Sequence, residues 1–134
     1  MVCAFADHEQ VIIFTANATT LIPMAPLISK ECGVDMSKKR FHIIGCEDID
    51  GFEAVALGEK VDTVKVEPGM VKLAKECLVR FPLARAFLFE CTELPPYSDA
   101  VRQACGLPVF DAITNCDFFM MSFRDNDRFG MNDW

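Results

Sequence analysis

The stretch ARAFLFECTELPPY, residues 84–97, decides the fold class of this chain. Its first half, 84–90, is a short apolar run rich in aromatic side chains, which is typical of a strand buried on both faces of a sheet. Two prolines then precede a helix predicted over 97–105, and Gly106 ends that helix. A buried strand followed at once by a helix is the repeating unit of a parallel α/β sheet.

The same alternation continues on both sides of this stretch. Apolar runs predict three more strands, at 10–15, 41–46 and 108–110. Amphipathic patterns and capping residues predict helices at 21–32, at 67–80 and from the N-cap Asp111 to about 123, with a loop and a helical turn at 48–58. The expected fold is therefore α/β, a single doubly wound domain over residues 1–134 with a four-stranded, mainly parallel sheet. Its core spans about 9–123, and the tail 124–134 is expected to dock back through Phe129 and Trp134.

Composition narrows the class of protein. A net charge of −7 argues against non-specific binding to nucleic acid, and no apolar run approaches the roughly 20 residues of a membrane span. The seven cysteines are irregularly spaced without any Cys-x-x-Cys pair, and His8 and His42 are not at zinc-finger spacing, so we expect no metal site. Without a visible secretory signal, reduced thiols in an intracellular compartment are the simplest expectation.

Polar residues follow the predicted strands, where parallel sheets bind their ligands. Three such segments are expected to converge: 15–19, 90–93 and 111–114. Cys91 is a candidate thiolate near backbone N–H groups, although most cysteines are small buried apolar residues.

The other candidates in these segments also have two interpretations. Thr15, Asn17 and Thr19 can hold a carboxylate or only cap the next helix, and Thr92 and Thr114 present the same choice. Glu90 and Glu93 are candidate supporting bases or plain solvated charges, and His42, inside a strand, is expected to be structural. Pattern alone predicts an anion pocket of substrate size with one thiol.

Two segments carry a resemblance to a known family. Phe87–Tyr97 and Gly106–Thr114 resemble the second lobe of the aspartate/glutamate/hydantoin racemase superfamily, in which a Cys-Thr pair follows a strand in each of two lobes. Residues 11–20 look like the strand and turn that open that lobe, so the resemblance covers about 9–123. Within the superfamily, residues 117–134 look like the end of the algal Alma-type dimethylsulfoniopropionate lyases.

The resemblance implies a cofactor-independent reaction on a small carboxylate substrate. A base removes the proton α to the carboxylate; a racemase returns a proton on the other face, whereas the lyase expels dimethyl sulfide and leaves acrylate. It implies that Cys91 is one of two catalytic cysteines and that Thr92 binds the substrate carboxylate, with Asn17 and Thr19 as companions.

The chain has no room for the first lobe that carries the other cysteine, so the expectation is a truncated paralogue or a fragment. Our leading hypothesis is a dimethylsulfoniopropionate lyase. The alternatives are a racemase for aspartate, glutamate or hydantoins, and an inactive lobe that associates with a full-length homologue. An uncovered apolar face leads us to expect a homo-oligomer or such an association.

Overall fold

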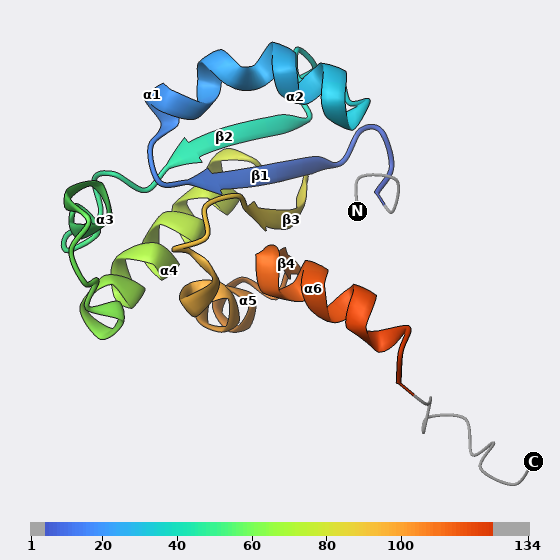
Figure 1. The fold of residues 1–134 in the computed structure, drawn as a ribbon. Helices are drawn as coiled ribbons and strands as arrows, with labels where there is room; N and C mark the ends of the chain where they lie inside the picture. The colour runs from blue at the N-terminus through green and yellow to red at the C-terminus, as the bar shows by residue number, and fades with distance from the viewer. Residues whose placement is uncertain (1–4, 125–134) are drawn as a thin grey trace, which may run out of the picture.

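The computed structural model describes residues 5–124 and contains one four-stranded parallel sheet. The strands are β1 (Gln10–Thr15), β2 (Phe41–Gly45), β3 (Ala84–Phe89) and β4 (Val109–Phe110), in the order β2-β1-β3-β4. Figure 1 shows them as one twisted layer between helices. The expected α/β class and the four-stranded, mainly parallel sheet are confirmed. Phe129 and Trp134, which we expected to dock the tail, lie outside the described residues.

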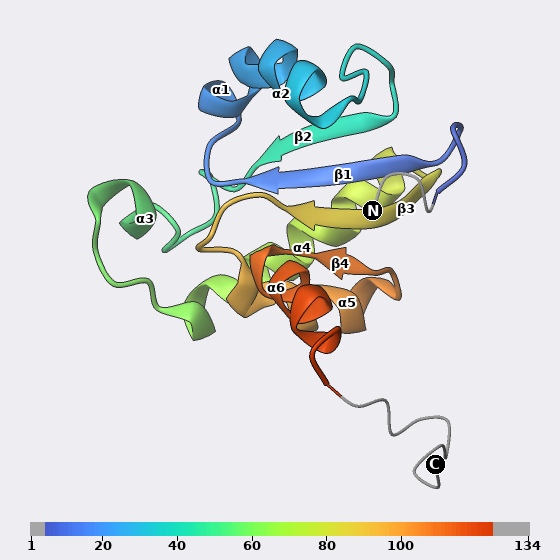
Figure 2. The ribbon, with the colours of Figure 1, turned by 45° about the vertical axis from the view of Figure 1, so that its right-hand side comes forward.

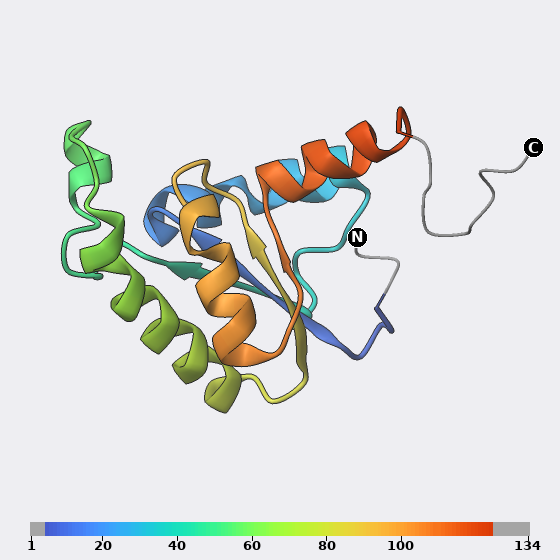
Figure 3. The same ribbon diagram turned by 90° about the horizontal axis from the view of Figure 1, so that it is seen from below.

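Helices cover both faces of the sheet. On one face lie α4 (Thr63–Arg80) and α5 (Ser98–Cys105), which follows the short 3-10 helix η3 (Pro95–Tyr97). The other face carries α1 (Ala18–Leu21), η2 (Ile22–Met24), α2 (Ala25–Cys32) and α6 (Ala112–Met121), while α3 (Ala54–Leu57) lies beyond the strand ends. Figures 2 and 3 show α6 on the same side of the sheet as α1 and α2. This is the doubly wound arrangement that alternating strands and helices produce.

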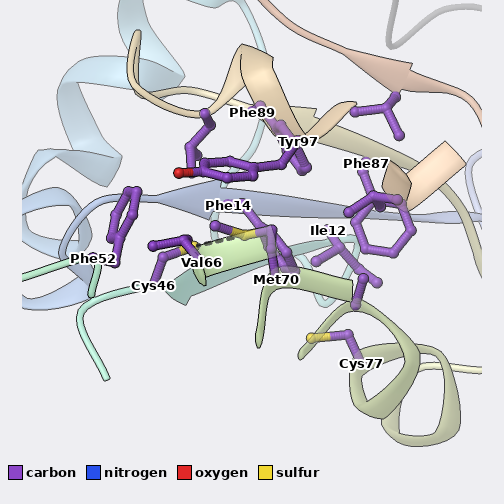
Figure 4. Packing of buried hydrophobic residues seen from close by; sticks show 14 of the residues in the cluster. Ile12, Phe14, Cys46, Phe52, Val66, Met70, Cys77, Phe87, Phe89 and Tyr97 are labelled. Carbon is purple, nitrogen blue, oxygen red and sulfur yellow. Dashed lines mark hydrogen bonds between the residues drawn. The ribbon is translucent and has the colours of Figure 1, made fainter. Parts of the chain in front are cut away.

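The hydrophobic core lies between the sheet and the α4–α5 face. Phe14 of β1 stacks on Phe89 of β3 at 5.4 Å between ring centroids and meets Phe87 edge-on, also at 5.4 Å. Met70 of α4 and Tyr97 close this layer, and all five side chains are almost fully buried (Figure 4). Burial of such side chains stabilises the fold by about 1.5–3 kcal/mol each, so this face holds the strands in place.

The opposite face is more thinly covered. Val11 and Ile13 of β1 are buried there, yet none of the residues of α1, α2 or α6 is buried. These helices and the residues beside them leave large apolar side chains in water: Ile22, Met24, Leu27, Ile113, Phe118, Phe119, Met120, Met121 and Phe123. Helix α6 is the extreme case, with Phe118 at 72% exposure. A large exposed apolar surface of this kind is typical of an interface.

Two predicted helices begin at other residues than expected. Helix α4 starts at Thr63 rather than 67, because the Asp62 side chain accepts hydrogen bonds from the Val64 and Lys65 backbone N–H groups and so caps an earlier turn. Pro68 therefore lies inside the helix instead of opening it. The predicted helix 21–32 is three pieces, because Asn17 caps the chain at Ala18 and a 3-10 turn at Ile22–Met24 accommodates the prolines.

Candidate functional site

A pocket of about 350 Å³ opens where β1 and β3 end, at the carboxyl edge of the sheet. It brings together five of the residues singled out from the sequence: Thr15, Asn17, Glu90, Cys91 and Thr92. The full lining is Thr15, Ala16, Asn17, Thr20, Leu21, Glu90, Cys91 and Thr92. Thr19 is exposed and is not part of the lining, and neither is any residue of the predicted third segment, 111–114. The site is thus built by two neighbouring strands rather than three.

Strand pairing places the two halves of this pocket side by side. Phe14 and Phe89 are register partners, and the Glu90 backbone N–H donates to the Phe14 carbonyl at 2.9 Å. Thr15 and Glu90 are therefore the next residues along adjacent strands. The buried Thr15 hydroxyl donates to Glu90 Oε2 at 2.9 Å, which holds the exposed carboxylate at the pocket. The separation of 75 positions along the chain explains why sequence reasoning did not pair them.

Asn17 serves mainly as a helix cap. Its Oδ1 accepts from the Thr19 N–H at 2.9 Å, from the Thr20 N–H at 3.3 Å and from the Thr19 hydroxyl at 2.5 Å. Of the two roles open to this segment, capping is the one its geometry displays. Within residues 5–124 the Asn17 amide nitrogen makes no hydrogen bond, so this is the group left to donate to a ligand.

Glu47 is a neighbour of the site that the sequence interpretation missed. Its carboxylate accepts from the Ala18 N–H at 3.2 and 3.3 Å, next to the Asn17 cap. To do so it folds back over Gly45, where an added Cβ would stand 1.7 Å from Glu47 Oε2. A side chain at position 45 would displace this carboxylate, so the glycine leaves room for the Glu47–Ala18 contact. In the sequence, the only signal for this contact was a glycine followed two residues later by a glutamate at the end of a predicted strand.

Cys91 differs from the other cysteines near the core. It is half-buried, packs against the core cluster and faces the pocket. Burial raises the pKa of Cys46 to about 12 and that of Cys77 to about 11, so both remain protonated thiols. Cys32 and Cys116 are exposed on helices away from the pocket lining. Among the described thiols, Cys91 is the one in the lining of this pocket.

The segment after β4 has a structural role. Asp111 and Thr114 form a reciprocal capping box at the start of α6: the Asp111 carboxylate accepts from the Thr114 N–H, and Thr114 Oγ1 accepts from the Asp111 N–H. The Ser98 hydroxyl donates to the same buried carboxylate. Capping is thus the role that Thr114 takes. The His42 ring stacks on Phe81, with the ring centroids 3.8 Å apart, and its structural role stays a prediction.

Residues 5–124 contain neither a candidate metal site nor a helix that could span a membrane. No group of three or more His, Cys, Asp or Glu side chains there is arranged to hold a metal ion. None of the helices in that part of the chain is both long and apolar enough to cross a bilayer.

Fold and site together define an α/β layer with a thiol, a carboxylate and hydroxyl donors in one pocket at the carboxyl ends of its parallel strands. The chain is homologous to dimethylsulfoniopropionate lyases. It is 57% identical to dimethylsulfoniopropionate lyase 7 of Emiliania huxleyi (strain CCMP1516) over 139 residues, which cover 100% of this chain. It is 55% identical to lyase 3 of the same strain, again over 100% of this chain. The lyase of Durusdinium sp. clade D is 53% identical over 98% of this chain.

The likeness covers only part of each relative. The chain corresponds to 40% of Emiliania lyase 7, 36% of lyase 3 and 44% of the Durusdinium lyase. It therefore spans less than half the length of these relatives. No protein-family model matches the chain, and no solved structure matches it.

Proposed function

We propose that this chain is part of a dimethylsulfoniopropionate lyase and that Cys91 is a catalytic residue of its pocket. The observation that carries the proposal is the position of Cys91 in the pocket between β1 and β3, in a chain more than half identical to lyases of that name. Thr92 and the Asn17 amide nitrogen are the proposed donors to the substrate carboxylate, because both line the same pocket. Thr19 supports them indirectly, by its hydrogen bond to the Asn17 oxygen.

The proposed reaction is a β-elimination. The Cys91 thiolate removes a proton from the carbon α to the carboxylate, and the electron pair of that C–H bond becomes the new double bond. The bond from the β carbon to sulfur breaks, and its electrons leave with the sulfur. The products are acrylate, neutral dimethyl sulfide and a protonated Cys91 thiol. The site has to hold the carboxylate, stabilise the developing enolate charge and present a base of suitable pKa.

We also propose that the domain is one lobe of a two-lobed, racemase-like enzyme. The length supports this, since the relatives are more than twice as long as the matched region. The apolar surface of α6 and α2 supports it as well, because the remainder of such an enzyme is a suitable cover for Phe118 and Phe119. The isolated chain, with this surface uncovered, is expected to self-associate. A monodisperse monomer by light scattering would count against the uncovered interface.

The direct test is release of dimethyl sulfide. The purified chain is incubated with dimethylsulfoniopropionate, alone and together with the part of the Durusdinium lyase that this chain does not match. Headspace dimethyl sulfide is measured against a Cys91→Ala control. We expect release that depends on Cys91. Release no greater than that of the control, in both incubations, would exclude the chain as a working part of a lyase.

A further inference from the structure

The pocket carries a single formal charge. Of its eight lining residues, Glu90 is the only one with a carboxylate, and no lysine, arginine or histidine from the described part of the chain lines it. The carboxylate is held at the pocket because Thr15, itself buried, donates its hydroxyl to Glu90 Oε2 at 2.9 Å. A purely anionic ligand would meet repulsion here without any compensating cation. A ligand with a positive group would be attracted.

We propose that Glu90 is the residue that selects a cationic substrate, by binding the dimethylsulfonium group of dimethylsulfoniopropionate. The inference rests on the proposed lyase function and adds the substrate feature that this site recognises. Thr92, Asn17 and Glu90 all line the pocket. In the proposed binding mode Thr92 and the Asn17 amide receive the carboxylate end of the ligand, and Glu90 receives the sulfonium end. Cys91, between Glu90 and Thr92 in the chain, is then near the carbon between the two charged groups.

The same arrangement separates this substrate from dicarboxylic amino acids. Aspartate carries a second carboxylate where dimethylsulfoniopropionate carries its sulfonium, and glutamate carries one a carbon further along; the ammonium group of both is on the α carbon, beside the first carboxylate. That second carboxylate would lie against Glu90, and a like-charge contact disfavours binding. Thr15 is the positioning residue in this scheme, because its hydroxyl fixes the orientation of Glu90 without contacting the ligand's charge itself.

The test compares two ligands of almost the same shape. In 4-methylpentanoate a neutral carbon replaces the sulfonium of dimethylsulfoniopropionate, so the pair differs mainly in one positive charge. Binding of both is measured by calorimetry on proteins that carry Cys91→Ala, so that no substrate is consumed. We expect the sulfonium to bind about fivefold more tightly, the upper range for an ion pair that solvent reaches. Adding Glu90→Gln is expected to remove the preference.

Asp48→Asn is the matched control. Asp48 is an exposed carboxylate just after β2, outside the pocket lining, so its removal changes the net charge equally and should keep the preference. The assignment is overturned if the preference for the sulfonium survives Glu90→Gln, or if Asp48→Asn abolishes it equally. It is also overturned if neither ligand binds. Failure of the lyase proposal is a different result, in which the preference follows Glu90 but the unmodified chain releases no dimethyl sulfide.

Discussion

Replacing Asp111 with alanine should lower the free energy of unfolding more than the same replacement of an exposed carboxylate does. Two losses add up. The N-cap of α6 is removed, which costs about 1 kcal/mol. The Ser98 hydroxyl is left buried without its acceptor, which costs about 1–3 kcal/mol. The expected decrease in the free energy of unfolding is therefore about 2–4 kcal/mol, a large part of the 5–15 kcal/mol of a typical domain.

The assay is urea denaturation followed by circular dichroism, with Asp99→Ala as the control. Asp99 is a carboxylate on the exposed surface of α5, next to Ser98, and its substitution should cost less than about 1 kcal/mol. In the double variant Ser98→Ala/Asp111→Ala no hydroxyl is orphaned, so it should lose less stability than the sum of the two single variants. An Asp111→Ala variant as stable as Asp99→Ala would refute the structural role of the capping box.

The same residue predicts a pH effect. Burial by itself raises the pKa of Asp111, but the hydrogen bonds from Ser98 and Thr114 outweigh it, and the pKa lies below the usual value of 3.8. Since the folded-state pKa is depressed, the stabilisation is present above the unfolded value and is lost as pH falls through the folded pKa. Asp111→Ala should therefore lose less stability than the wild type on acidification below about pH 4.

Two further predictions concern other ionisable groups. Burial, and then the charge of Arg80, lower the pKa of His42 below 6.5. Stability should therefore be full above pH 6.5 and decline below it, and thermal melts of His42→Phe, which retains the ring stack on Phe81, should lose this dependence, whereas an unchanged profile would contradict it. Iodoacetamide at pH 7.5 should label Cys32, Cys91 and Cys116 well before Cys46 and Cys77, whose burial raises their pKa values to about 12 and about 11. Mass spectrometry of the peptides provides the order, and early labelling of Cys46 would show that the core is more open than described.

Local signals were enough to predict the sheet and the position of Cys91. The buried strands read as continuous apolar runs, and Asp111 was correctly predicted as an N-cap because a capping residue acts within one turn. The predicted start of α4 was wrong because Pro68 was interpreted as a residue of the first turn. The cap is Asp62, about one turn earlier than the predicted start.

Contacts between distant segments could not be predicted in the same way. The Thr15–Glu90 hydrogen bond depends on the register of β1 against β3, and the Glu47–Ala18 contact depends on how β2 pairs with β1. Register depends on how the buried faces of two distant strands match in the assembled sheet, so the pattern of one strand does not specify it. Thr19 was a candidate because it follows the first strand and because of the family resemblance, but its hydroxyl donates to Asn17 Oδ1.

The central claim is that Cys91 removes the α proton of a sulfonium substrate, which then releases dimethyl sulfide. Proton NMR of dimethylsulfoniopropionate in D₂O tests both steps in one experiment, with the chain complemented by the unmatched part of the Durusdinium lyase. We expect acrylate and dimethyl sulfide signals that grow with the wild-type chain and do not grow with Cys91→Ala. Acrylate formed at the same rate by both proteins would contradict the claim, and so would exchange of the α protons for deuterium without any acrylate.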